Sequence, residues 1–174
     1  MKLVITELNP GHDRAGFDCG GPALNVFLQR LARQQSVRDF SKTYVACAPD
    51  TSKILGFYAI SSGSIDFAHL PPALRLPRYP VPVARLARLA VDKRAQGQGM
   101  GAVLLSHAVR LAVMLAEHIG LYALVVDAKD EAAAAFYQRH GFEWFPDRPL
   151  TLLLTLEVAR QARLAASGNP GAAH

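Results

Sequence analysis

The sequence predicts an α/β domain, and three observations support this prediction. Segments with strand-like and helix-like patterns alternate through the second half of the 174 residues, which is typical of a sheet with helices packed on it. Hydrophobic residues make up 51% and charged residues 19%, as in a globular protein with an apolar core. No segment reaches the roughly 20 apolar residues that a membrane-spanning helix needs. We expect one domain over residues 1–160, a flexible C-terminal tail over 161–174, and, since no signal peptide is apparent, a cytoplasmic location.

The first half of the chain predicts a strand, a helix and a hairpin. Residues 2–7 have a strand pattern, and Pro22 follows two glycines at a position where proline suits the first helical turn. Apolar residues then recur at helical spacing: Leu24, Phe27, Leu28 and Leu31. Residues 43–48 and 54–62 predict two antiparallel strands joined by a Pro-Asp-Thr-Ser turn.

The second half predicts further strands and helices after a proline-rich segment. Residues 69–82 carry five prolines and two arginines, which excludes a central strand and leaves either a loop beside a site or a plain connector. The alternation that follows implies some parallel pairing. The expected strands are 83–91, 121–128 and 150–156, and the expected helices are 102–118 and 131–140.

Cysteine spacing and charge restrict the possible functions. Cys19 and Cys47 have neither metal-binding nor redox spacing, so reduced packing cysteines are expected. The net charge is +5, and arginine supplies most of the 19 basic residues. Because arginine forms forked bonds to phosphates, an anionic partner and a merely anionic cofactor both remain open.

The clearest motif is a glycine-rich turn between a strand and a long helix. Arg94 begins it, and glycines follow at positions 97, 99 and 101. Glycines allow several N–H groups to converge, and the helix N-terminus adds about half a positive charge, which suits a pyrophosphate. A Walker A loop needs a Lys-Ser/Thr pair that is absent, and the glycine spacing differs from a dinucleotide fingerprint.

These residues resemble those of the GNAT family of N-acetyltransferases. Arg94, Gly97 and Gly99 match its R/Q-x-x-G-x-G/A motif, and residues 135–142 are similar to its later Phe-Tyr and Gly-Phe segment. The resemblance implies a mixed, mostly antiparallel sheet, split like a V in the middle, with helices on both faces. It also implies acetyl-CoA as co-substrate and no metal. The residues implied in acetyl-CoA binding are Leu89, Ala90, Val91, Gln96, Gly97, Gln98, Gly99, Met100, Gly101, Asp130 and Phe136.

The resemblance places Tyr137 near the thioester sulfur as the general acid. A phenol of pKa about 10 can donate a proton to a departing thiolate, although a packing role for this tyrosine is the alternative. No strong general base is evident, because Asp92 and the scattered histidines are better explained as structural or solvated residues. An α-amine titrates near pH 7.7–8.0 and needs little help, so the pattern weakly favours an α-amine substrate.

Most of the chain further resembles the GNAT toxins of toxin–antitoxin modules, over roughly residues 5–156. The similar segments are 17–20, 56–61, 78–82, 85–92, 119–120 and 126–128. This resemblance implies acetylation of aminoacyl-tRNA, a block of translation, a homodimer and a ribbon-helix-helix antitoxin. The candidate tRNA contacts are Arg30, Arg33, Arg38, Arg75, Arg78, Arg85 and Arg88.

Three alternatives remain at this point. One is a GNAT enzyme that acts on a small-molecule amine or a protein N-terminus. Another is a non-catalytic acyl-CoA-binding regulator, against which Tyr137 argues. A pure nucleic-acid-binding module would leave the glycine turn unexplained.

Overall fold

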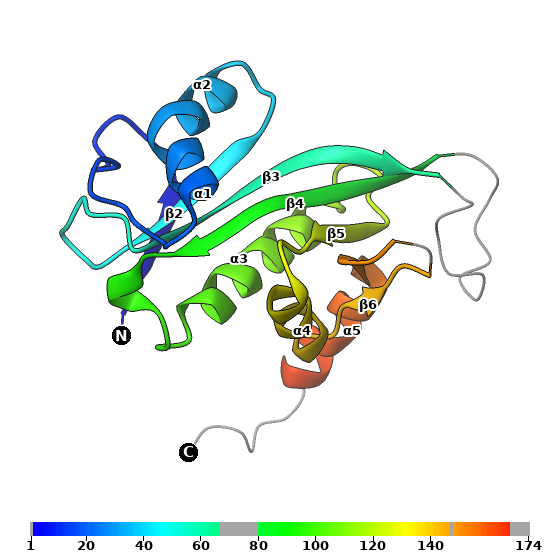
Figure 1. Cartoon of the computed structure of the whole chain (residues 1–174). Helices are drawn as coiled ribbons and strands as arrows, with labels where there is room; N and C mark the ends of the chain where they lie inside the picture. Colours follow the sequence, from blue (N-terminus) through cyan, green and yellow to red (C-terminus); the bar gives the residue numbers. More distant parts are fainter. Residues whose placement is uncertain (1, 67–79, 147, 168–174) are drawn as a thin grey trace. The chain divides into compact units, whose positions relative to one another are not determined.

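A computed structural model describes residues 2–66, 80–146 and 148–167, and Figure 1 shows their helices and strands. Seven strands form one sheet in the order β1-β2-β3-β4-β5-β7-β6. The strands are β1 (Val4–Glu7), β2 (Lys42–Cys47), β3 (Gly56–Ile65), β4 (Val81–Val91), β5 (Ala123–Asp127), β6 (Glu143–Trp144) and β7 (Thr151–Thr155). The helical segments are α1 (Pro22–Val26), η1 (Phe27–Leu31), α2 (Ala32–Val37), η4 (Lys93–Ala95), α3 (Met100–Leu115), α4 (Glu131–Arg139) and α5 (Leu156–Ser167). The predicted mixed α/β fold with a mostly antiparallel sheet is confirmed.

The chain divides into two compact units, one within residues 1–61 and 86–108 and the other within 62–85 and 109–174. In the first unit β2 pairs antiparallel with β1 and with β3, and Val45 lies opposite Phe57. This confirms the predicted hairpin. Its apolar core lies beneath the helical segment, where the ring of Phe57 lies edge-on to Phe17 and is stacked with an offset on Phe27.

The predicted helix after Pro22 is confirmed, but its middle is a π-helix that the sequence pattern did not predict. In η1 the N–H of Ala32 donates to the carbonyl of Phe27, a bond that spans five residues. Such a turn holds one residue more than an α-helical turn and is frequent at functional sites. Phe27 and Leu28, adjacent in the chain, are both buried here.

In the second unit β5 and β7 pair antiparallel, with Val125 opposite Leu153, and the core includes Val83. The alternating pattern predicted some parallel pairing in the sheet without assigning it to particular strands, and this pair is antiparallel. The reason is β6, a two-residue strand that pairs antiparallel with β7 and thus reverses the chain once more before β7 begins.

The helices and strands differ from the sequence prediction by one to three residues at most of their ends, and one helix was not predicted. β4 is a central strand that begins at Val81 and includes Pro82, so the exclusion of a central strand from residues 69–82 is wrong for its last two residues. α3 begins at Met100, two residues earlier than predicted. An unpredicted helix, α5, runs across residue 160, where we expected the domain to end. Residues 67–79, which hold most of the proline-rich segment, and residues 168–174 lie outside the described residues. No helix in the described ranges is long and apolar enough to span a membrane.

Candidate active site

The glycine turn connects β4 to α3 through the short helix η4. Gly97 and Gly99 have φ angles of +77° and +79°, in the left-handed region that side chains other than glycine rarely adopt. A Cβ atom at either position would meet nothing within 4 Å. Backbone conformation, not lack of space, therefore requires glycine at both positions.

The main-chain N–H groups of the turn are available for a ligand. Those of residues Gln96 to Gly101 donate no hydrogen bond to any residue in the described parts of the chain. The turn also leads directly into the N-terminus of the 16-residue α3, whose dipole favours an anion. These features fit the pyrophosphate role that the sequence predicted for residues 96–101.

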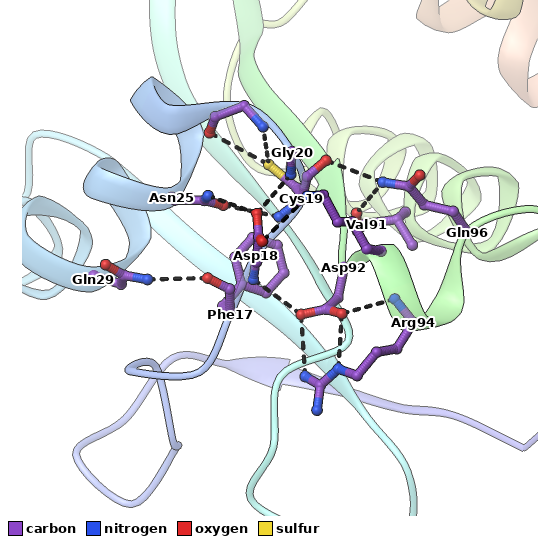
Figure 2. A network of polar contacts seen from close by, with 12 residues as sticks. Phe17, Asp18, Cys19, Gly20, Asn25, Gln29, Val91, Asp92, Arg94 and Gln96 are labelled. Atoms are coloured by element: carbon purple, nitrogen blue, oxygen red, sulfur yellow. Dashed lines mark hydrogen bonds and ion pairs between the residues drawn. The ribbon is translucent and has the colours of Figure 1, made fainter.

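The side chain of Asp92 holds the start of this turn, as Figure 2 shows. Its Oδ1 accepts from Arg94 N at 2.9 Å and Arg94 Nε at 2.8 Å, while Oδ2 accepts from Arg94 Nη2 at 3.1 Å and Asp18 N at 3.0 Å. Asp92 is only 2% exposed. The hydrogen bond from Arg94 is the main cause that lowers the pKa of Asp92 to about 2, against desolvation. A carboxylate held in this way is a structural anion, which agrees with the sequence interpretation that it is no general base.

A second set of bonds ties the turn to the loop before α1 (Figure 2). Gln96 Nε2 donates to Cys19 O at 3.1 Å and to Val91 O at 2.9 Å. Asp18 Oδ1 accepts from Gly20 N and Asn25 Nδ2. The sequence interpretation missed this loop, and the only signal was the resemblance of residues 17–20 to the toxins.

Close packing inside the first unit fixes the direction of α3. An added Cβ at Gly56 of β3 would lie 2.8 Å from Leu104 Cδ1 and 3.1 Å from the carbonyl oxygen of Ala90. A larger residue at position 56 would therefore have to displace the Leu104 side chain and press on the Ala90 carbonyl. The N-terminus of α3 is thereby held beside the end of β4.

Tyr137 belongs to the other unit and lies on α4, whose N-terminus is capped by Asp130. Asp130 Oδ1 accepts from Ala133 N at 2.8 Å, which stabilises the first turn. Tyr137 is 7% exposed, and its ring lies edge-on to Phe136 and Phe142. This burial raises its pKa to about 12. Its hydroxyl makes no hydrogen bond to any described residue. Because its pKa is raised, the hydroxyl keeps its proton and can donate it to a ligand.

Two of the four histidines considered from the sequence have structural contacts, and His118 is exposed. His140 Nδ1 lies 2.8 Å from Phe136 O, and His107 Nδ1 lies 2.6 Å from the hydroxyl of Tyr58. His69 lies outside the described residues. Among the described residues no group of three His, Cys, Asp or Glu side chains could hold a metal ion, and the two cysteines form no disulfide.

The structure separates the candidate arginines by their contacts. Arg85 forms an ion pair with Asp127 at 2.7 Å. Arg88 stacks on the ring of Phe27, with Cζ 3.9 Å from its centre, and Arg38 stacks in the same way on Phe40 at 4.5 Å. The others remain candidates without a described contact: Arg30 and Arg33 lie on the first helical segment, and Arg75 and Arg78 fall outside the described residues.

Comparison with known proteins establishes the family. Residues 39–144 match the model described as acetyltransferase (GNAT) domain. The chain belongs to the GNAT acetyltransferase family. It is 39% identical over 156 residues, covering 88% of this chain and 92% of the relative, to a protein of Mycobacterium tuberculosis named "tRNA-acetylating toxin".

Solved structures of GNAT toxins share this fold at 27–31% identity. The crystal structure of a tyrosine-to-phenylalanine mutant of KacT gives a TM-score of 0.87 and 31% identity, covering 93% of this chain and 99% of KacT. AtaT complexed with acetyl-methionyl-tRNA gives 0.85 and 29%, covering 93% and 99%. AtaT bound to the C-terminus of the antitoxin AtaR gives 0.81 and 27%, covering 92% and 97%.

Proposed function

We propose that this protein is an acetyl-CoA-dependent toxin that acetylates the α-amine of aminoacyl-tRNA and thereby blocks translation. The observation that carries the proposal is the 39% identity to a tRNA-acetylating toxin over 88% of the chain. At this identity and coverage, the whole domain is shared and not the cofactor motif alone. The complex of AtaT with acetyl-methionyl-tRNA supports the same substrate class.

The chain would bind acetyl-CoA mainly through its backbone. The co-substrate supplies an acetyl thioester on a pantetheine arm that carries phosphates. The main chain of Leu89 to Val91 would pair with the arm, and the unpaired N–H groups of Gln96 to Gly101 would bind the pyrophosphate. The bonds of Asp92 and Gln96 hold these donors in place before the ligand arrives. Preorganised donors of this kind bind without a cost of reorganisation.

Phe136 and Asp130 would line the pantetheine side, as the family resemblance implies. The contacts of Asp130 add a second role, since its carboxylate caps α4. Phe136 contacts the rings of Tyr137 and His140. Asp130 therefore also stabilises the helix that carries Tyr137.

Tyr137 would act as the general acid. The substrate amine attacks the thioester carbonyl, the carbon–sulfur bond breaks, and the sulfur takes the proton of the Tyr137 hydroxyl. The proton that the amine loses as the amide forms would return to the Tyr137 phenolate, which restores the hydroxyl. Because the pKa of Tyr137 is raised to about 12, the hydroxyl carries its proton throughout the physiological range. An α-amine is partly neutral there and needs positioning more than a strong base.

We further propose that the protein is cytoplasmic, forms a homodimer, and is neutralised by a ribbon-helix-helix antitoxin. Support for an antitoxin comes from the similarity to AtaT, which has been solved with the C-terminus of AtaR. Co-expression of the toxin with the neighbouring open reading frame should restore growth, and light scattering of the pure protein should give twice the chain mass.

The decisive experiment is transfer of labelled acetyl from acetyl-CoA to a pool of charged tRNAs. We expect label on the aminoacyl ester, and none on deacylated tRNA incubated in parallel. Hydrolysis of the ester should release the label as an N-acetyl amino acid, which also identifies the preferred amino acid. Unlabelled tRNA from a protein that still binds acetyl-CoA would replace this proposal with a small-molecule or protein amine.

A further inference from the structure

Arg88 is a half-buried arginine on the strand that would hold the pantetheine arm. Side chains alternate along a strand, so Arg88 and Ala90 of β4 share one face of the sheet. Ala90 belongs to the core beneath the first helical segment, together with Phe27. The Arg88 side chain therefore lies on the face of β4 that this helix covers, and its Cζ is 3.9 Å from the centre of the Phe27 ring.

The guanidinium of Arg88 has no acceptor among the described residues. Two other arginines near the site use their N–H groups within the protein: Arg94 on Asp92 and Arg85 on Asp127. Arg88 makes no hydrogen bond or ion pair to any described residue, and desolvation lowers its pKa. Because the side chain is only partly buried, an anion from outside can reach the guanidinium N–H groups, which donate to no described residue.

The contact with Phe27 orients the guanidinium of Arg88 so that two of its N–H groups can bind one anion together. Phe27 is 1% exposed and lies at the start of the π-helix, so its ring is a fixed platform. A guanidinium stacked on a ring face keeps its edge N–H groups free in the plane of the group. That edge matches the spacing of two phosphate oxygens.

We propose that Arg88 binds a phosphodiester of the RNA substrate close to its aminoacylated end. The inference rests on the proposed function. The reason for placing the phosphodiester near the aminoacylated end is the short distance along β4 between Arg88 and the residues that would bind the pantetheine arm. A strand rises about 3.3 Å per residue, so Arg88 lies within about 10 Å of the main chain of Leu89 to Val91. The reacting amine must reach the thioester there. The amino acid's own carboxylate is esterified in aminoacyl-tRNA, so the nearest anions are the phosphodiesters of the last nucleotides.

The test compares two acceptors that carry the same amino acid, an aminoacyl-tRNA and the amino acid methyl ester. In Arg88→Gln we expect kcat/KM for the tRNA to fall about 10- to 100-fold, as for loss of a charge-assisted hydrogen bond. The plot of log kcat/KM against log salt should become shallower by about one unit. Turnover of the methyl ester and the KM for acetyl-CoA should stay at wild-type values, because neither involves this phosphate.

Two further variants separate binding from folding. Arg88→Lys keeps the positive charge but loses the pair of parallel N–H donors. Compared with Arg88→Gln, it should recover part of the activity on tRNA and of the salt dependence. Arg110→Ala removes an exposed arginine of α3 and controls for net charge; it should behave as wild type. The melting temperature of each variant verifies that it is folded.

Each alternative outcome contradicts the proposal in its own way. An equal loss with methyl ester and tRNA would make Arg88 structural or catalytic, and a raised KM for acetyl-CoA would assign the phosphate to the co-substrate. Wild-type kinetics in Arg88→Gln would remove the site while leaving the proposed function intact. If the wild-type enzyme acetylates the methyl ester but no tRNA, both the Arg88 site and the proposed function are wrong.

Discussion

The two regions with proposed roles in catalysis, the glycine turn and the surroundings of Tyr137, are built by opposite means. The turn offers main-chain N–H groups that charged and polar side chains hold in place, with Asp92 at the centre. Tyr137 offers one hydroxyl, surrounded by aromatic rings that exclude water. Hydrogen bonds lower the pKa of Asp92 to about 2, whereas burial raises the pKa of Tyr137 to about 12.

This difference fits the role proposed for each region. A site for a permanently charged pyrophosphate benefits from fixed donors, and an ionised network is a stable way to fix them. A proton donor must stay neutral until the reaction, and desolvation disfavours the charged form of a phenol. Variants in the two regions should therefore change different observables.

The largest effect is expected from Tyr137→Phe, which removes the hydroxyl and keeps the ring. Loss of a general acid should lower kcat for acetyl transfer by about 10²- to 10⁴-fold. Because the hydroxyl has no bond to a described residue, the melting temperature and the affinity for acetyl-CoA should stay close to wild type. Undiminished kcat would reduce Tyr137 to a packing residue.

The next largest effect is expected from Asp92→Asn, which should lower the free energy of unfolding and change kcat for acetyl transfer only little. The carboxylate has a pKa of 3.8 in a free chain and about 2 when folded, which corresponds to about 2 kcal/mol of folding free energy at neutral pH. A lowered folded pKa gives stability that is present above pH 4 and lost as the pH falls towards 2.

Urea unfolding at several pH values measures this effect. The wild type should lose this contribution between about pH 4 and pH 2, whereas Asp92→Asn should lack it at every pH. Asp50→Asn, at an exposed aspartate, serves as the matched control. Equal pH profiles for wild type and Asp92→Asn would show that the network does not stabilise the fold.

A smaller effect is expected from Gly99→Ala. The positive φ should cost about 1 kcal/mol for alanine, although the added Cβ has open space. If the turn relaxes to avoid this strain, the affinity for acetyl-CoA should fall about five- to tenfold, as calorimetry would measure. Gly16→Ala, also in open space but without a positive φ, should bind acetyl-CoA as wild type does. A loss in Gly16→Ala of the same size would point to a general effect of alanine.

The smallest effect is expected from Arg85→Gln in the unit that carries Tyr137. The ion pair with Asp127 is partly exposed, with side chains 28% and 51% accessible, and such pairs contribute less than about 1 kcal/mol. Since Asp127 already occupies this arginine, the KM for aminoacyl-tRNA should change less than in Arg88→Gln. A rise as large as that of Arg88→Gln would show that the substrate displaces Asp127.

The sequence predicted more of the glycine turn than of the residues that hold it in place. The glycine motif and its place between a strand and a helix could be predicted, because left-handed φ angles and helix N-termini each favour particular residues at nearby positions. The loop around Asp18 and Asn25 was not, since its bonds to Asp92 and Gln96 join residues more than 70 positions apart. A two-residue strand such as β6 is also too short to show any period.

The sequence by itself determined the family, the mixed α/β fold, the co-substrate and the positions of the turn and of Tyr137, because these depend on local motifs in a fixed order. Only the tertiary structure decided how the polar residues are used. It pairs Asp92 with Arg94 and Arg85 with Asp127, and it leaves Arg88 stacked on Phe27 without an acceptor among the described residues. Burial and hydrogen bonding depend on contacts between distant parts of the chain, which no local pattern encodes.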